Sequence, residues 1–143
     1  MKRLIRYACI VVALAILVAV PIHTKAVDVR ASSYFMAYDS YLWKTTGTTF
    51  EVWFDVLACD YMDELGVNSI KVQRSSDGEN WATMKIYYPD VYSQMISEDT
   101  LDHVGCVTYT GTSGYYYRAC VTFYAKNSSG TGMRVDYAET IRL

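Results

Sequence analysis

Apolar and polar side chains alternate along several stretches of the chain. Within TFEVWFDVLA, residues 49–58, Phe50 and Phe54 fall on one side of an extended backbone, and Glu51 and Asp55 fall on the other. Successive side chains of a β-strand point to opposite faces of the sheet, so a period of two residues is typical of a strand. The segment therefore predicts a strand with one buried and one exposed face.

The same alternation recurs further along the chain. SIKVQR sets Ile70 and Val72 against Lys71. A tight turn is expected next at Asp77-Gly78, because glycine tolerates a positive φ, and WATMKIYY then returns as the second arm of a hairpin. The other expected strands span residues 32–43, residues 133–143 and two segments on either side of residues 110–114.

One long segment, PDVYSQMISEDTLDHVG at residues 89–105, does not alternate. Pro89 and the polar interior favour a surface loop, in which the spacing of Val91 and Met95 leaves room for one helical turn. About seven strands joined by turns, with almost no helix, predict an all-β fold, a single antiparallel β-sandwich.

The N-terminus has the three parts of a secretory signal peptide. The start, MKRLIR, is positively charged, and residues 7–20 form an apolar run without charge. Small Thr24 and Ala26 then occupy the −3 and −1 positions that a signal peptidase requires. The apolar run is shorter than the roughly 20 residues of a membrane-spanning helix, which makes an uncleaved anchor the less favoured alternative. We expect residues 1–26 to be a signal peptide, with a second acceptable cleavage site after Ala31.

Cleavage would leave one domain, residues 32–143, secreted to the extracellular space. Of the 13 Lys and Arg residues four lie in the signal, so nine remain against 15 Asp and Glu, a net charge of −6. A chain this acidic lacks the positive field that attracts phosphate backbones and anionic lipid surfaces. Neither nucleic acid nor, after cleavage, a membrane is an expected partner.

Two segments resemble a known family. IKVQRSSDGENW, residues 70–81, is similar to a strand, tight turn and following Trp of fibronectin type III and related immunoglobulin-like modules. YYYRACVTFYAKNSSGTG, residues 115–132, resembles the Tyr-rich strand and turn near the end of those modules. The combination of MDELGVNSIKVQRSSDGENW with YTGTSGYYYRA is also similar to a group of small secreted Firmicutes proteins of unestablished function, and so points to a bacterial chain. The resemblance implies a fibronectin III-like or immunoglobulin-like β-sandwich, with Tyr115 or Tyr117 hydrogen-bonded back across its end.

The Tyr-rich strand has two different faces. Its odd positions are apolar and predict a core, whereas Tyr116, Arg118 and Tyr124 are expected on the outer face. In a fibronectin-like arrangement the hairpin of residues 69–88 shares a sheet with this strand. Because neighbouring side chains of a strand point to opposite faces, one of Tyr87 and Tyr88 is then expected on the same outer face. Aromatic rings beside an arginine suit sugars or an extended peptide. Exposed Tyr and Thr also occur on strands simply because they fit a pleated surface.

Few residues of the chain are candidates for catalysis or metal binding. His103 is expected in a solvated loop, although a hydrolase that combines it with an acid and a serine is an alternative. Asp60, Asp63 and Glu64 form a weak calcium candidate if they meet in a loop, and no Cys/His set has zinc spacing. No cofactor is expected. Cys59, Cys106 and Cys120 remain after cleavage, and the sequence leaves their pairing open.

These observations favour a secreted, non-catalytic interaction module that binds a surface glycan or protein through its aromatic sheet face. The alternatives are the hydrolase that uses His103 and a structural surface protein with no discrete ligand.

Overall fold

The structure is a computed structural model that describes residues 33–143. The predicted signal peptide lies outside the described residues. Within them the fold is all-β and antiparallel, as expected from the sequence. The seven strands are β1 (Phe35–Lys44), β2 (Thr49–Ser75), β3 (Ala82–Tyr87), β4 (Ile96–Thr110), β5 (Tyr116–Asn127), β6 (Gly130–Tyr137) and β7 (Ile141–Arg142), and a 3-10 turn, η1 (Ser93–Met95), precedes β4.

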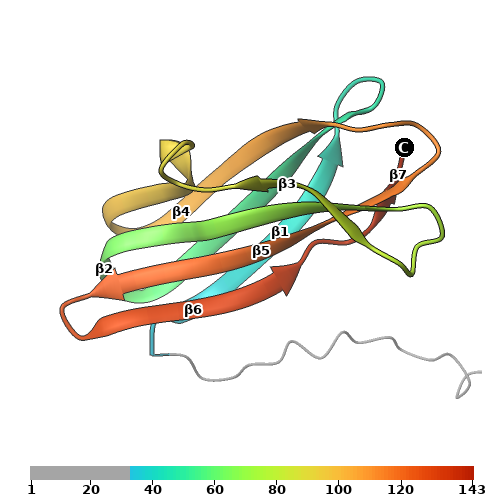
Figure 1. Cartoon of the computed structure of the whole chain (residues 1–143). Coiled ribbons are helices and arrows are strands. Elements are labelled where there is room, and N and C mark those ends of the chain that lie inside the picture. Colours follow the sequence, from blue (N-terminus) through green and yellow to red (C-terminus); the bar gives the residue numbers. More distant parts are fainter. Residues whose placement is uncertain (1–32) are drawn as a thin grey trace, which may run out of the picture. The chain divides into compact units, whose positions relative to one another are not determined.

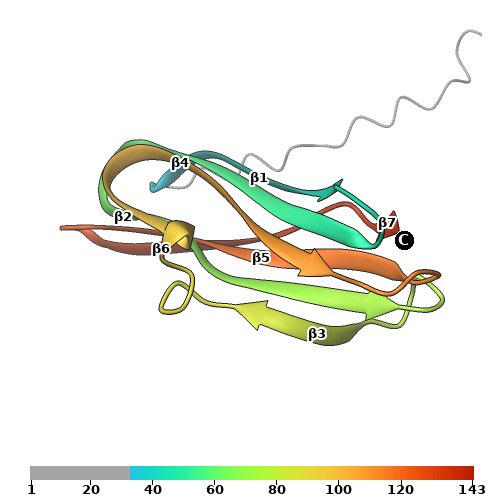
Figure 2. The same cartoon turned by 90° about the horizontal axis from the view of Figure 1, so that it is seen from above.

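All seven strands belong to one hydrogen-bonded sheet that curls around its own core (Figure 1). The cause is the 27-residue strand β2, whose first half pairs with β1 and β4 and whose second half pairs with β3 and β5. Seen from above, β1 and β4 lie over β5 (Figure 2). Side chains from the two halves of the sheet meet in the interior, where the Phe50 and Tyr117 rings are 5.3 Å apart.

The bend of β2 has a local cause. The pairing register shifts between Leu57 and Met62 and again between Val67 and Ser69, and such bulges kink a strand and increase its twist. Gly66 lies between the two shifts with φ of +152°, and a Cβ there would stand 2.1 Å from the backbone oxygen of Met95. Only glycine lets β2 pass this closely to η1.

The core has the phase that the sequence predicts. It contains Phe54 from the first half of β2 and Ile70 and Val72 from the second half, together with Val121 and Phe123 of β5. All five side chains are fully buried in one cluster. The period-2 prediction is therefore confirmed on both sides of the bend.

The loop predicted for residues 89–105 is wrong over most of its length. β4 begins at Ile96, and Gly105 pairs with Phe54. β4 shows no apolar alternation in the sequence because it buries only Val107 fully, and backbone pairing to β2 holds it in place. The single helical turn allowed for this segment is present as η1.

Two turns hold the hairpins in place. Between β2 and β3, Asp77 accepts hydrogen bonds from the backbone of Glu79 and from the backbone and side chain of Asn80. These bonds, chiefly the one from the Asn80 side chain, hold the pKa of the Asp77 carboxyl well below its usual range. Before β5, the Tyr117 hydroxyl accepts a 2.8 Å bond from the backbone N–H of Thr112. The bond ties the turn before β5 to the first residues of that strand.

Candidate binding face

Side chains that alternate with the buried ones cover the outer surface of β3, β2, β5 and β6. Lys71 stands in register with Ile86 of β3 on one side and Cys120 of β5 on the other, and Tyr137 of β6 continues the row. We call this surface the cationic face; its outward positions are Thr83, Ile86, Tyr88, Ser69, Lys71, Gln73, Tyr116, Arg118, Cys120, Thr122, Tyr124, Met133, Val135 and Tyr137, with Trp81 at its edge.

Arg118 lies between two aromatic rings of this face. Its guanidinium carbon is 4.3 Å from the centre of the Trp81 ring and 5.1 Å from that of Tyr137. Its Nε also donates a 2.9 Å hydrogen bond to Oε1 of Gln73. Three contacts fix the plane of the guanidinium, so a ligand would not have to order it on binding.

The cationic face exposes unusually large apolar side chains. Tyr88 is 48% exposed, Met133 49%, Val135 54% and Tyr137 55%. Between them, Cys120 and Thr122 of β5 are short. The face therefore has small side chains along its centre and large ones on both sides, and a cluster of exposed apolar groups marks an interaction surface more often than scattered single residues do.

The structure brings most of the predicted site residues together. Tyr116, Arg118 and Tyr124 share the outer face of β5, and Tyr88, directly after β3, is exposed. Burial and the neighbouring Glu64 raise the pKa of Tyr124. Across the end of the face, the Tyr116 ring lies 5.2 Å from the guanidinium carbon of Arg142.

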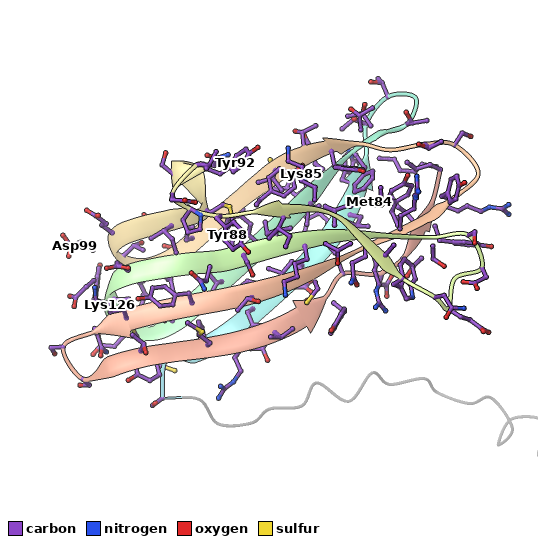
Figure 3. The ribbon with its side chains drawn as sticks, in the orientation of Figure 1. Met84, Lys85, Tyr88, Tyr92, Asp99 and Lys126 are labelled. Atoms are coloured by element: carbon purple, nitrogen blue, oxygen red, sulfur yellow. The ribbon has the colours of Figure 1, made fainter. Side chains whose placement is uncertain are left out.

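Tyr87 does not belong to this surface. It is 1% exposed, and its hydroxyl donates a 2.7 Å hydrogen bond to the backbone oxygen of Thr108. The ammonium group of Lys85 lies over the rings of Tyr87 and Tyr92 at the edge of β3. Figure 3 shows Lys85 and Tyr92 near each other, with Tyr88 on the segment between them. Of the two tyrosines that phase left open, Tyr88 is the outward one.

Sequence reasoning missed Tyr137. The residue lies in a predicted strand, but its place beside Arg118 depends on the pairing of Cys120 with Tyr137, which local alternation does not specify. The alternation of Met133 and Val135 with polar residues was the one sequence feature that could have indicated an outward face on β6.

The three residues of the weak calcium candidate do not meet in a loop. Asp60, Asp63 and Glu64 lie on the continuous strand β2 and not in a loop. Glu64 forms an ion pair of 2.5 Å with Lys126, which Figure 3 labels near the end of β5, and this pairing raises the pKa of Lys126. In residues 33–143 no group of three His, Cys, Asp or Glu side chains could hold a metal ion.

His103 is on strand β4 and not in a solvated loop, so that expectation is also wrong. Its Nε2 lies 2.9 Å from the backbone oxygen of Gln94, and its ring packs 5.4 Å from that of Phe54. The half-buried imidazole therefore contacts a carbonyl and an aromatic ring. The acid and serine that the hydrolase alternative needs are not among these contacts.

The cysteines lie on different surfaces. Cys120 is at the centre of the cationic face, whereas Cys106 pairs with Trp53 on the opposite side of the molecule. No disulfide joins these two or Cys59 within the described residues. Burial and the nearby Glu51 carboxylate raise the pKa of the Cys106 thiol.

A second outer surface covers β1, the first half of β2 and β4. We call it the acidic face. Asp39 and Asp55 are opposite each other across β1 and β2, and together with Asp102 they line a shallow hollow. Next to them the rings of Tyr41 and Trp53 stack with centres 6.3 Å apart. The outward positions of this face are Ala37, Asp39, Tyr41, Trp43, Glu51, Trp53, Asp55, Leu57, Asp102, Val104, Cys106 and Thr108.

Comparison of the chain with protein-family models, with curated proteins and with solved structures gives no match. Among residues 33–143 there is no helix with the length and apolar character needed to cross a membrane.

Proposed function

We propose that the chain is a non-catalytic interaction module that binds a surface protein or glycan through its cationic face. The observation that carries the proposal is Arg118, held between Trp81 and Tyr137 on a surface of exposed apolar side chains. Aromatic residues and Arg contribute most of the binding energy at many interfaces, and both lose little conformational freedom when they are already fixed.

The chemistry of the cationic face suits binding without turnover. Its central rows present hydroxyls, a thiol, rings and cations, and no carboxylate or imidazole that would act as a general base. A ligand on such a surface is positioned by apolar contact and by the donors of Arg118 and Lys71. A relatively open sheet face favours a protein surface or an extended chain over a small buried substrate.

We infer further that the module is exported and that its curled sheet is a form of the fibronectin III-like or immunoglobulin-like β-sandwich. Residues 1–26 support export by their charge and apolar run. The strand order β3-β2-β5-β6 supports the second inference, because the hairpin shares its half of the sheet with the Tyr-rich strand. N-terminal sequencing of exported protein is expected to begin at Val27 or Ser32; a retained chain that begins at Met1 contradicts export.

Binding to a panel of immobilised glycans, extracellular proteins and the protein itself tests the proposed face. Replacing both exposed rings, Tyr88→Ala with Tyr137→Ala, is expected to weaken binding at least about tenfold, because aromatic anchors of an interface are typically worth that much. The control is Tyr61→Ala, since Tyr61 is 68% exposed on the bend of β2, outside the face. If a partner binds the folded double variant as tightly as the wild type, the cationic face is not the site.

A further inference from the structure

The two outer faces of the sheet carry opposite charges. In the four rows of the acidic face the carboxylates are Glu51, Asp39, Asp55 and Asp102, and these rows contain no lysine or arginine. Nine Lys and Arg residues remain after residue 26 against 15 Asp and Glu, yet none of the nine stands in these rows.

The central rows of the cationic face have the reverse composition. Their charged members are Lys71 and Arg118, with Arg142 across the end of the face, and no carboxylate stands among the side chains in register with these three. Glu64, at the far end of the same surface, is neutralised by Lys126. The rows of Lys71 and Arg118 therefore carry only positive charge, whereas the hollow at the Tyr124 end of the same surface is lined by Glu64, Asp90 and Glu98.

The acidic face places two like charges opposite each other. Asp39 and Asp55 are direct cross-strand partners, and like charges in that position repel each other. Nothing on the acidic face supplies a counter-charge, whereas cations from outside would relieve the repulsion. The hollow lined by Asp39, Asp55 and Asp102 opens to the surface and can admit the end of a long basic side chain.

Apolar groups accompany the charge on both surfaces. The acidic face exposes Trp43 at 61% and Val104 at 52%, beside the stacked Tyr41 and Trp53 rings. On the cationic face Tyr137 and Val135 are exposed to a similar degree. Rings and aliphatic groups at the centre with complementary charges around them are the usual composition of a protein interface.

Building on the proposed function, we propose that the partner of the cationic face is the acidic face of a second copy of this chain. The two faces lie on opposite sides of the molecule, because both are on the outer surface of the curled sheet and their inner sides meet at Phe50 and Tyr117. A contact between two different surfaces of identical molecules is heterologous, and it continues from copy to copy unless the rotation closes a ring. Copies therefore associate head to tail.

The size of the contact sets its strength. Three strands about 4.8 Å apart and four rows about 6.8 Å apart give a footprint of roughly 10–15 Å by 20 Å. This is less than the roughly 800 Å² per partner of a standard stable complex, so a single contact is weak and assembly depends on concentration. Because charge attraction contributes, association decreases as salt rises.

Sedimentation velocity of the chain over rising concentration, in low and in high salt, tests the proposal. Two variants each remove charge from one face: Lys71→Gln with Arg118→Gln, and Asp39→Asn with Asp55→Asn. Each is expected to associate with itself at least about tenfold more weakly than the wild type in low salt. Mixed in equal amounts, they retain one intact cationic and one intact acidic face between them, and are expected to form a 1:1 dimer that grows no further.

Thermal melts of both variants control for folding, and the Asp39→Asn, Asp55→Asn variant is expected to melt no lower than the wild type because it removes a repulsion. A wild type that stays monomeric at about millimolar concentration in low salt overturns the proposal. Variants that associate like the wild type, or a mixture that stays monomeric while the wild type assembles, overturn it as well. If the wild type is monomeric but loses a glycan or another protein when Tyr88 and Tyr137 are replaced, the proposed function stands and only this partner is wrong.

Discussion

At the scale of single residues, alternation alone separates the inside of this molecule from its outside. Phe123 and Val121 are buried, whereas Thr122 and Tyr124 between and beside them reach the surface. The same rule sorts Tyr87 from Tyr88 once the strand is known. It does so because a period of two is a property of the backbone and needs no knowledge of the partner strand.

Removing the Phe123 ring is expected to lower the free energy of unfolding by about 3–5 kcal/mol, since it leaves a cavity in a fully packed core. The ring also packs 5.1 Å from that of Tyr38, so the loss extends to both halves of the sheet. The measurement is urea unfolding of Phe123→Ala.

Lys71→Ala on the same sheet is the matched control and is expected to remain within about 0.5 kcal/mol of the wild type. Equal stability of the two variants would show that the strand phase is assigned the wrong way round.

The environment of Arg118 could be predicted only in part. The outward direction of Arg118 follows from the alternation along its strand. The position of Trp81 near it follows from the hairpin turn at Asp77-Gly78. Tyr137, in contrast, reaches Arg118 through the register of β5 with β6. A shift by one residue would reverse the direction of every side chain on β6, and no local pattern fixes that choice.

At the scale of elements, the failures of sequence reasoning cluster around the bend of β2. A loop was considered for Asp60, Asp63 and Glu64, but these residues lie on a continuous strand that is bent by bulges. β4 was missed over residues 96–105 for a related reason. Its partner is the bent part of β2, and only Val107 on the strand is fully buried.

Gly66 explains why the bend can be so tight. Its backbone passes the carbonyl of Met95 so closely that a side chain would collide with it. Sequence alone marks Gly66 as a place where strand order weakens, and an isolated glycine in a strand often signals a bulge. The contact of Gly66 with η1 depends on the tertiary structure, so this local signal does not reveal it.

At the scale of the whole molecule, the all-β class follows from the sequence pattern, and the shared sheet of the hairpin and the Tyr-rich strand is what the family resemblance implies. The separation of charge between two outer faces follows from neither. It requires knowing that Asp39 and Asp55 are cross-strand partners and that Lys71 and Arg118 stand on the other side of the core. Charges that are distant in the sequence add up to a strong surface potential only when the fold brings them to one surface.

The most direct test of the central claim, that the cationic face is a contact surface, uses two of the three thiols in residues 33–143. Cys120 is at the middle of the cationic face and Cys106 is on the acidic face. The rate at which an uncharged maleimide labels each thiol in the wild type is measured at low salt and fixed pH as protein concentration rises. Both rates are expected to fall together, about tenfold when nine-tenths of the faces are occupied, and to stay constant in the two charge-removed variants. A Cys120 rate that stays constant while the protein assembles would contradict the account.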